Sequence, residues 1–268
     1  MARPYIVMCA PNGARKTHAD HPALPISAEE LADCAESIVH AGASIMHVHV
    51  RDDAGCHSLD VARYQAATDA IRGRVGDDLV IQVTTEACGI YAPGQQVAMV
   101  KDLKPEAVSL ALKELCPDEA CEATAKDFFS WLDAEGVLPQ YILYTPDEVE
   151  RFVRLRDRGV IPDKRPFVLF VLGRYSDDLT GDPTELRAFL SALDDDTEWA
   201  VCCFGRTEQQ AARLAASAGG HARVGFENNV FLPDGDSASD NAALVRLAAN
   251  CRGERPIATA TDVRNLFS

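Results

Sequence analysis

Eight short apolar runs recur along the chain, and longer amphipathic segments separate them. The apolar runs cover residues 4–10, 44–50, 79–85, 106–112, 138–144, 166–172, 198–204 and 222–226. Helix-like patterns follow them, near residues 28–42, 60–73, 94–103, 122–135, 146–158, 183–193, 207–218 and 238–250. Strands that are apolar throughout and alternate with helices indicate a parallel sheet that is buried on both faces.

Eight such repeats in 268 residues predict an α/β fold, namely a (β/α)8 TIM barrel that forms a single domain over residues 1–268. A doubly wound open sheet is the alternative, but no GxGxxG or phosphate-binding loop follows any of the runs. Helix ends are marked by Ser27 and Gly42 for the first helix and by Pro183 for the sixth. The TEQQ stretch at Thr207 resembles a capping box for the seventh.

The formal net charge of −15 makes nucleic acids and anionic membranes unfavourable partners. An anionic substrate would therefore need local positive charge from a metal ion or a well-placed arginine. No apolar run approaches the roughly 20 residues of a membrane span. The nine cysteines are scattered, with no CxxC pair, which is typical of reduced thiols in a cytoplasmic protein.

Two histidines share the second apolar run, 44-SIMHVHV-50. His47 and His49 are two residues apart, so in a strand both imidazoles point to the same face. On spacing alone they are either core histidines or a pair of metal ligands. In a barrel they lie near the carboxyl end of the second strand, where active sites of this fold are found.

The eighth run ends in 223-RVGFENN-229 at the same mouth, next to the first strand. It places Arg223, Glu227 and Asn228 there, and the loop 10-APNGARKT-17 follows the first strand. Two imidazoles and one carboxylate, with one coordination position left open, make a catalytic zinc set. This combination favours a metal site over a pair of core histidines.

The His47-x-His49-x-Arg51 motif, the PNGA loop and the RVGFEN segment together resemble the β-keto acid cleavage enzyme family, whose namesake is the 3-keto-5-aminohexanoate cleavage enzyme. QVTT, PEAVSLAL, FVLG and 258-ATATDVR-264 extend the resemblance over nearly the whole chain. It implies a (β/α)8 barrel, usually a homotetramer, with Zn²⁺ held by His47, His49 and Glu227. The implied reaction converts a β-keto acid and acetyl-CoA into acetoacetate and a new acyl-CoA.

The resemblance also implies roles for residues of this chain around the metal. Arg223 matches the arginine that the family uses near the reacting carbons, and its alternative role is a salt bridge at the barrel mouth. Thr84 matches a hydroxyl residue that would bind the substrate, and Ser109 is a weaker candidate of the same kind. For both hydroxyls the alternative is a buried group bonded to the backbone. Asn12, in the PNGA loop, is a further candidate for substrate binding.

The sequence departs from the family pattern at the proposed mouth. Asn228 stands where the family usually has Asp; an amide can orient an arginine but cannot accept a proton. Arg15 stands where Glu is common, which suggests a substrate with an extra anionic group. The 139-PQYILY-144 segment lacks the usual strand-5 glutamate. Glu86 is a candidate general base in place of the missing acid; otherwise it is a loop charge or a partner of Arg51.

Several charged and polar residues near strand ends have less specific interpretations. Asp52 and Asp53 are turn residues that could support the histidines. Lys16, Lys113 and Arg174 could hold the phosphates of CoA. His18 and His21 flank the loop after the first strand and could reach the site, but exposure is the expectation for both. The apolar tail 263–268 is compatible with packing on a neighbouring subunit.

Two other functions remain open from the sequence. One is a zinc-dependent hydrolase of the amidohydrolase type, or another zinc lyase on the same barrel. Those hydrolases carry HxH on the first strand, whereas here it is on the second, and His221 begins the eighth strand at the opposite end of the barrel. The other is a metal-binding homologue with weakened catalysis, which Asn228 keeps open.

Overall fold

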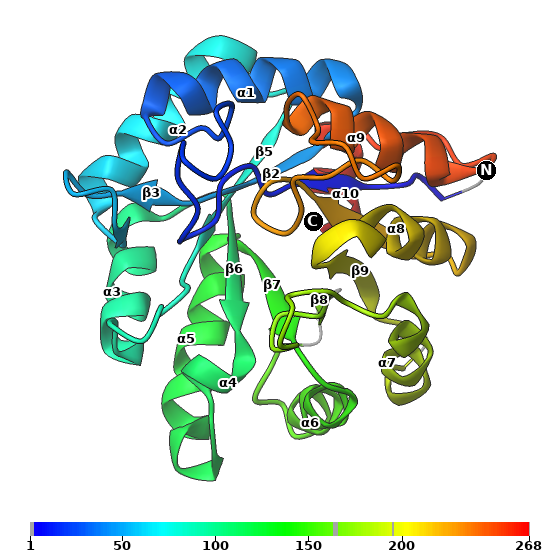
Figure 1. Cartoon of the computed structure of the whole chain (residues 1–268). Helices are drawn as coiled ribbons and strands as arrows, with labels where there is room; N and C mark the ends of the chain where they lie inside the picture. Colours follow the sequence, from blue (N-terminus) through cyan, green and yellow to red (C-terminus); the bar gives the residue numbers. More distant parts are fainter. Residues whose placement is uncertain (1–2, 163–165, 195, 268) are drawn as a thin grey trace.

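Eight parallel strands close into a barrel in the computed structural model, which describes residues 3–162, 166–194 and 196–267 (Figure 1). Around the barrel the strand order is β1-β10-β9-β8-β7-β6-β5-β2. The strands are β1 (Val7–Cys9), β2 (Ile45–Val48), β5 (Val80–Thr84), β6 (Ala107–Ala111), β7 (Leu138–Leu143), β8 (Phe167–Leu172), β9 (Glu198–Cys203) and β10 (His221–Val224). The pairing of β1 with β10 closes the sheet, so the expected (β/α)8 barrel is confirmed and the open sheet is wrong.

Helices surround the barrel on its outside (Figure 1). They are α1 (Ala28–Ala41), α2 (Val61–Val75), α3 (Pro93–Leu103), α5 (Glu122–Glu135), α6 (Pro146–Asp157), α7 (Leu186–Ala192), α8 (Glu208–Ser217) and α9 (Asn241–Ala249). Ser27 forms a capping box with Glu30 at the start of α1, as expected. The capping box at Thr207 is wrong, because its hydroxyl bonds the carbonyl of Gly181 instead, at 2.7 Å.

Elements outside the eightfold pattern were not visible in the periodicity. A hairpin of β3 (Val50–Arg51) and β4 (His57–Ser58) follows β2, and the short helix α4 (Leu112–Leu115) follows β6. The helix α10 (Ala260–Phe267) ends the described chain. Short 3-10 turns complete the connections at Glu119–Cys121, Pro183–Glu185, Gly205–Thr207 and Asn250–Arg252. No helix among the described residues is both long and apolar enough to cross a membrane.

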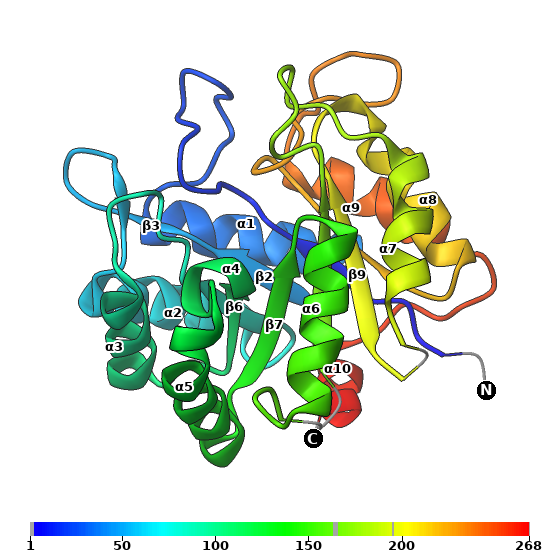
Figure 2. The same cartoon turned by 90° about the horizontal axis from the view of Figure 1, so that it is seen from below.

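The apolar core has two parts because strand side chains alternate between the two faces of the sheet. One part packs between strands and outer helices, and the other fills the barrel interior. The interior part continues into α10, where Val263 is fully buried and the Phe267 ring lies 4.9 Å from that of Phe167. Figure 2 shows α10 at the end of the barrel opposite the long strand-to-helix loops. The described part of the apolar tail therefore packs on its own barrel.

Shortening the buried side chain of Val263 should weaken the packing of α10 on the end of the barrel. Val263→Ala removes two methyl groups from a fully buried site and should lower the free energy of unfolding by about 2 kcal/mol. The exposed Thr261→Ala on the same helix should change it by less than about 0.5 kcal/mol. Urea denaturation of both variants checks this, and equal losses would contradict the packing role of α10.

Candidate functional site

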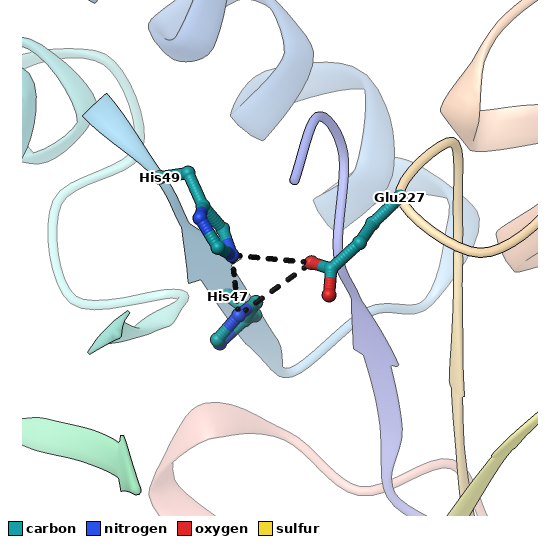
Figure 3. A group of neighbouring side chains, drawn as sticks. All are labelled: His47, His49 and Glu227. Carbon is teal, nitrogen blue, oxygen red and sulfur yellow. Dashed lines mark hydrogen bonds and ion pairs between the residues drawn. The ribbon is translucent and has the colours of Figure 1, made fainter. Parts of the chain in front are cut away.

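Three ligand-type side chains converge at the carboxyl end of the barrel (Figure 3). His47 lies on β2, His49 lies directly after it, and Glu227 lies in the turn after β10. Glu227 Oε2 is 3.5 Å from His47 Nε2 and 3.4 Å from His49 Nε2, and the two imidazole nitrogens are 3.0 Å apart. The histidines are buried, and Glu227 is nearly so. The sequence prediction that these three residues share one site is consistent with this geometry.

The segment after β1 holds Glu227 in place through hydrogen bonds to its backbone. The Glu227 N–H donates to the carbonyl of Ala10 at 3.0 Å, and Lys16 Nζ donates to the Glu227 carbonyl at 2.7 Å. Gly13 has a left-handed φ of +62°, and a Cβ there would lie 2.6 Å from Glu227 Cγ. Glycine is thus required both by the backbone and by the close approach of the carboxylate side chain.

Amide side chains inside the barrel orient the first histidine. His47 Nδ1 lies 2.9 Å from Gln82 Oε1, and Gln82 Nε2 donates to Gln140 Oε1 at 3.2 Å. An amide oxygen only accepts, so His47 Nδ1 carries the hydrogen and Nε2 keeps its lone pair toward Glu227. Partners of this kind fix the tautomer of metal-binding histidines.

The second histidine is held through its backbone and by a third imidazole. Asn12 Nδ2 donates to the His49 carbonyl at 2.9 Å, and Asn12 Oδ1 accepts from the His49 N–H at 3.4 Å. The β3–β4 hairpin brings His57 Nδ1 to 3.5 Å from His49 Nδ1, and His57 Nε2 lies 2.9 Å from the Glu86 carbonyl. Sequence reasoning missed His57 because the hairpin that turns it toward the site was not predicted.

Charge pairing keeps the carboxylate ionised in its buried setting. Arg223 Nη2 donates to Glu227 Oε1 at 3.1 Å. Burial works to raise the pKa of Glu227, but Arg223 and the two imidazoles outweigh it and hold that pKa well below its usual range. Burial lowers the pKa of His47 to about 3, so its imidazole is neutral at pH 7. A deprotonated carboxylate and a neutral imidazole are the forms that bind metals.

The geometry fits a tetrahedral divalent ion. Zinc bonds to nitrogen and oxygen of about 2.0–2.1 Å place two tetrahedral ligands about 3.3–3.4 Å apart. The three separations of 3.0, 3.4 and 3.5 Å lie close to that value. Glu227 Oε2 has no hydrogen-bond donor among the described residues although it is buried, as expected of an oxygen reserved for an ion.

A pocket opens beside these three residues, and the space outside protein atoms is about 420 Å³ when the open solvent at its mouth is included. It is lined by His47, His49, Thr84, Glu86, Ser109, Ala111, Ile142, Tyr144, Val171, Arg174, Phe204, Arg223 and Glu227. Among described residues, Ser109 Oγ and Arg223 Nε and Nη1 are buried polar atoms without a hydrogen-bond partner. These free groups make the pocket suited to a ligand with several oxygen atoms.

Three candidate residues do not line this pocket. Asn12 is fully buried, and its amide bonds the backbone of His49. Arg15 is 57% exposed and pairs with Glu86 at 3.0 Å, so Glu86 is not the partner of Arg51. Neither Nδ2 nor Oδ1 of Asn228 has a hydrogen-bond partner among the described residues, so the expected bond from Asn228 to Arg223 is not formed. Glu227 and Cys202 bond Arg223 instead.

Other expectations for charged residues and histidines also need correction. Asp52 accepts backbone N–H groups of its own turn and Asp53 pairs with Arg63, so neither supports the histidines. His21 is buried against the ring of Phe226 rather than exposed. His221 lies on the barrel interior next to Phe167, at the end remote from the site, as expected.

A buried glutamate that the sequence did not reveal braces the turn that carries Glu227. Glu208, the first residue of α8, accepts from the Gly225 N–H at 3.1 Å and from Asn229 Nδ2 at 3.3 Å. Burial raises the pKa of Glu208 to about 8, and these hydrogen bonds only partly oppose it. The position of Glu208 at the helix start suggested only a helix cap, because its partners lie in the turn after β10.

Comparisons with known proteins identify the family of the chain and agree with its fold. A family model described as beta-keto acid cleavage enzyme matches residues 4–268. The chain is 32% identical to a 3-keto-5-aminohexanoate cleavage enzyme of Fusobacterium nucleatum, covering 100% of this chain and 99% of the relative. It is 30% identical to a 3-oxoadipate:acetyl-CoA acetyltransferase of Cupriavidus necator, covering 100% and 95%. A solved ternary complex of ObcA with a C4-CoA adduct and oxalate has the same fold, with a TM-score of 0.73 and 18% identity over 92% of this chain and 67% of that one.

Adding a methyl group at Gly13 should displace Glu227. If the three residues hold a divalent metal ion, Gly13→Ala should weaken the affinity for Zn²⁺ at least about 10-fold, because the new Cβ collides with the Glu227 side chain. Gly55→Ala is a matched control, since Gly55 has a φ of +78° but nothing within 4 Å of the added Cβ. Titration against a competing zinc chelator measures both, and equal affinities would contradict the placement of Glu227.

The buried Glu208 carboxyl should make stability depend on pH. Its folded pKa of about 8 lies above the ordinary 4.5, so its contribution is full below pH 4.5 and is lost as the pH rises through 8. Relative to Glu208→Gln, the wild type should lose at least about 2 kcal/mol of unfolding free energy between pH 5 and pH 8.5. Urea denaturation at both pH values measures this, and a constant difference would show that Glu208 does not titrate in that window.

Proposed function

Because the chain belongs to the beta-keto acid cleavage enzyme family, we propose that it is a zinc-dependent enzyme that condenses a β-keto acid with acetyl-CoA. In this reaction the CH2–COO⁻ unit of the keto acid leaves its acyl group and joins the acetyl group, giving acetoacetate. The displaced acyl group becomes the thioester of CoA, so no further reactant is needed. The convergence of His47, His49 and Glu227 at tetrahedral spacing carries this proposal.

His47 and His49 would hold the ion through Nε2, and Glu227 would hold it through Oε2. When bound, zinc supplies a Lewis acid beside the pocket, which favours the build-up of negative charge on a keto oxygen. Arg223 complements this charge from the protein side. Nε and Nη1 of its guanidinium have no partner among the described residues, and Cys202 and Glu227 raise its pKa despite burial, so it stays cationic. It would bind and orient the substrate's carboxylate or keto oxygen.

Two hydroxyl groups on neighbouring strands can bind further substrate oxygens. Ser109 Oγ has no partner among the described residues and lines the pocket. Thr84 Oγ1 accepts the Glu86 N–H at 3.0 Å, which leaves its own hydrogen free to donate. Thr84 and Ser109 are register partners on β5 and β6, so both hydroxyls can act on one ligand.

Glu86 is the candidate base for the proton of the CH2 group. It lines the pocket, is 25% exposed, and its Oε2 lies 3.9 Å from His49 Nδ1. Burial works to raise the pKa of Glu86, but His49 and Arg15 outweigh it, so the carboxylate is ionised and able to accept a proton. Asn228 cannot take this role, because an amide has no site for the proton at neutral pH.

Acetoacetate release tests the proposal directly. Protein loaded with zinc should release acetoacetate from acetyl-CoA and at least one member of a panel of β-keto acids with aliphatic, cationic and carboxylate tails. His47→Ala should lower zinc affinity by more than about 100-fold and abolish release. The exposed His40→Ala should leave both unchanged.

One outcome would favour a different function. Stoichiometric zinc without acetoacetate from any keto acid would contradict the proposed reaction. It would support a metal-binding homologue with weakened catalysis, for which the unpartnered Asn228 is the structural observation. Appearance of activity in Asn228→Asp would then identify the missing group.

A further inference from the structure

One cation in the pocket lacks an anionic partner. Arg174, directly after β8 and the adjoining Gly173, lines the pocket. Its guanidinium lies 5.6 Å from the centre of the Tyr175 ring and 5.7 Å from that of Phe204. No carboxylate lies within ion-pair distance of Arg174 in the described ranges 3–162, 166–194 and 196–267. Aromatic contacts thus hold the guanidinium while its charge stays available.

The carboxylates that line the pocket already form ion pairs with arginines of the chain. Of the described residues that line it, Glu227 and Glu86 are the carboxylates. Glu227 pairs with Arg223 at 3.1 Å and faces the metal position, and Glu86 pairs with Arg15 at 3.0 Å. A substrate with a cationic tail would therefore find no free carboxylate here, and would face the charge of Arg174.

The strand order sets the distance between Arg174 and the metal position. Around the ring β1-β10-β9-β8-β7-β6-β5-β2, the strand β8 lies four positions from β2 in either direction. Arg174 and the His47–His49 pair therefore stand on opposite sides of the barrel mouth, with the pocket between them. A substrate whose keto acid end lies at the metal would reach Arg174 with its other end.

Resting on the proposed function, we propose that the β-keto acid carries a second carboxylate at its far end and that Arg174 binds it. The substrate class is thus a 3-oxo dicarboxylic acid. Arg15, which the sequence suggested for this role, is exposed, pairs with Glu86 and does not line the pocket. Arg174 is thus proposed as a specificity-determining residue. The reacting end of the keto acid would bind at the other side of the pocket, next to His47, His49 and Glu227.

Matched substrates test the role of Arg174. The comparison uses a 3-oxo dicarboxylate and a 3-oxo monocarboxylate of the same carbon number, at saturating acetyl-CoA. The wild type should prefer the dicarboxylate in kcat/KM by at least about 10-fold. Arg174→Ala should abolish this preference by lowering kcat/KM for the dicarboxylate, while kcat/KM for the monocarboxylate stays unchanged. Arg174→Lys should keep part of it. Arg187→Ala, an exposed arginine of α7, controls for the change in net charge.

The same variants distinguish the two possible sources of the anion. If Arg174 binds a phosphate of CoA instead, Arg174→Ala will raise the KM for acetyl-CoA with both keto acids alike, and the proposal is overturned. A preference for the dicarboxylate that survives in Arg174→Ala overturns it as well. Arg174→Glu adds a gain-of-function arm, since it should shift the preference toward a keto acid with an ammonium tail.

Direct binding separates this inference from the proposed function. Calorimetric titration of the zinc-loaded protein with each keto acid, without acetyl-CoA, should show tighter binding of the dicarboxylate that depends on Arg174. If no keto acid gives acetoacetate but this dependence is present, the reaction is wrong and the subsite is right. If acetoacetate forms while both keto acids bind equally to wild type and Arg174→Ala, the reaction stands and the subsite is wrong.

Discussion

Closure of the barrel between β1 and β10 is the constraint on which the site depends. Met8 on β1 pairs with Ile45 on β2 and with Arg223 on β10, so the strands that carry the histidines and the glutamate flank the same short strand. Residues 170 or more positions apart in sequence thereby share one corner of the barrel mouth. The loop after β1 fills the space between them, and Gly13 allows Glu227 to lie against it.

The site concentrates charge where the fold excludes water. Burying a carboxylate is costly unless it is paired, and Glu227 is paired with Arg223 and faces two imidazoles. Neutral amides, Gln82 and Gln140, support His47 from within the barrel without adding charge. The protein carries a net charge of −15, yet its pocket presents Arg174, which forms no ion pair among the described residues, and two nitrogen atoms of Arg223 that have no hydrogen-bond partner there. This local reversal of sign is what an anionic substrate requires.

Much of the fold and part of the site could be predicted from the sequence. Periodicity located every barrel strand, because strands buried on both faces are apolar throughout. The i, i+2 spacing of His47 and His49 fixed their common face, and barrel topology placed the turn after the last strand beside them. The family was also identified correctly from the HVHVR, PNGA and RVGFEN motifs.

Side-chain partners were less predictable, because they depend on tertiary distances that no local pattern encodes. Arg15 forms an ion pair with Glu86, which is 71 residues away in the sequence. The side-chain amide of Asn12 donates a hydrogen bond to the backbone carbonyl of His49. Thr207 bonds a neighbouring loop rather than its own helix, which local capping rules could not anticipate. Gln82 and Gln140 could have been recognised, because each is a polar residue on an otherwise apolar strand. Such a residue predicts a side chain that points into the barrel and hydrogen-bonds another polar group there.

The origin of the carbon atoms in acetoacetate tests the central claim most directly. Acetyl-CoA labelled with ¹³C at both acetyl carbons would be incubated with the zinc-loaded protein and an unlabelled β-keto acid, and the products followed by ¹³C NMR. Transfer of the CH2–COO⁻ unit predicts label at the keto carbon and the methyl group of acetoacetate, and none in the new acyl-CoA. Label in the carboxylate and CH2 carbons, or label in the acyl-CoA, would contradict it.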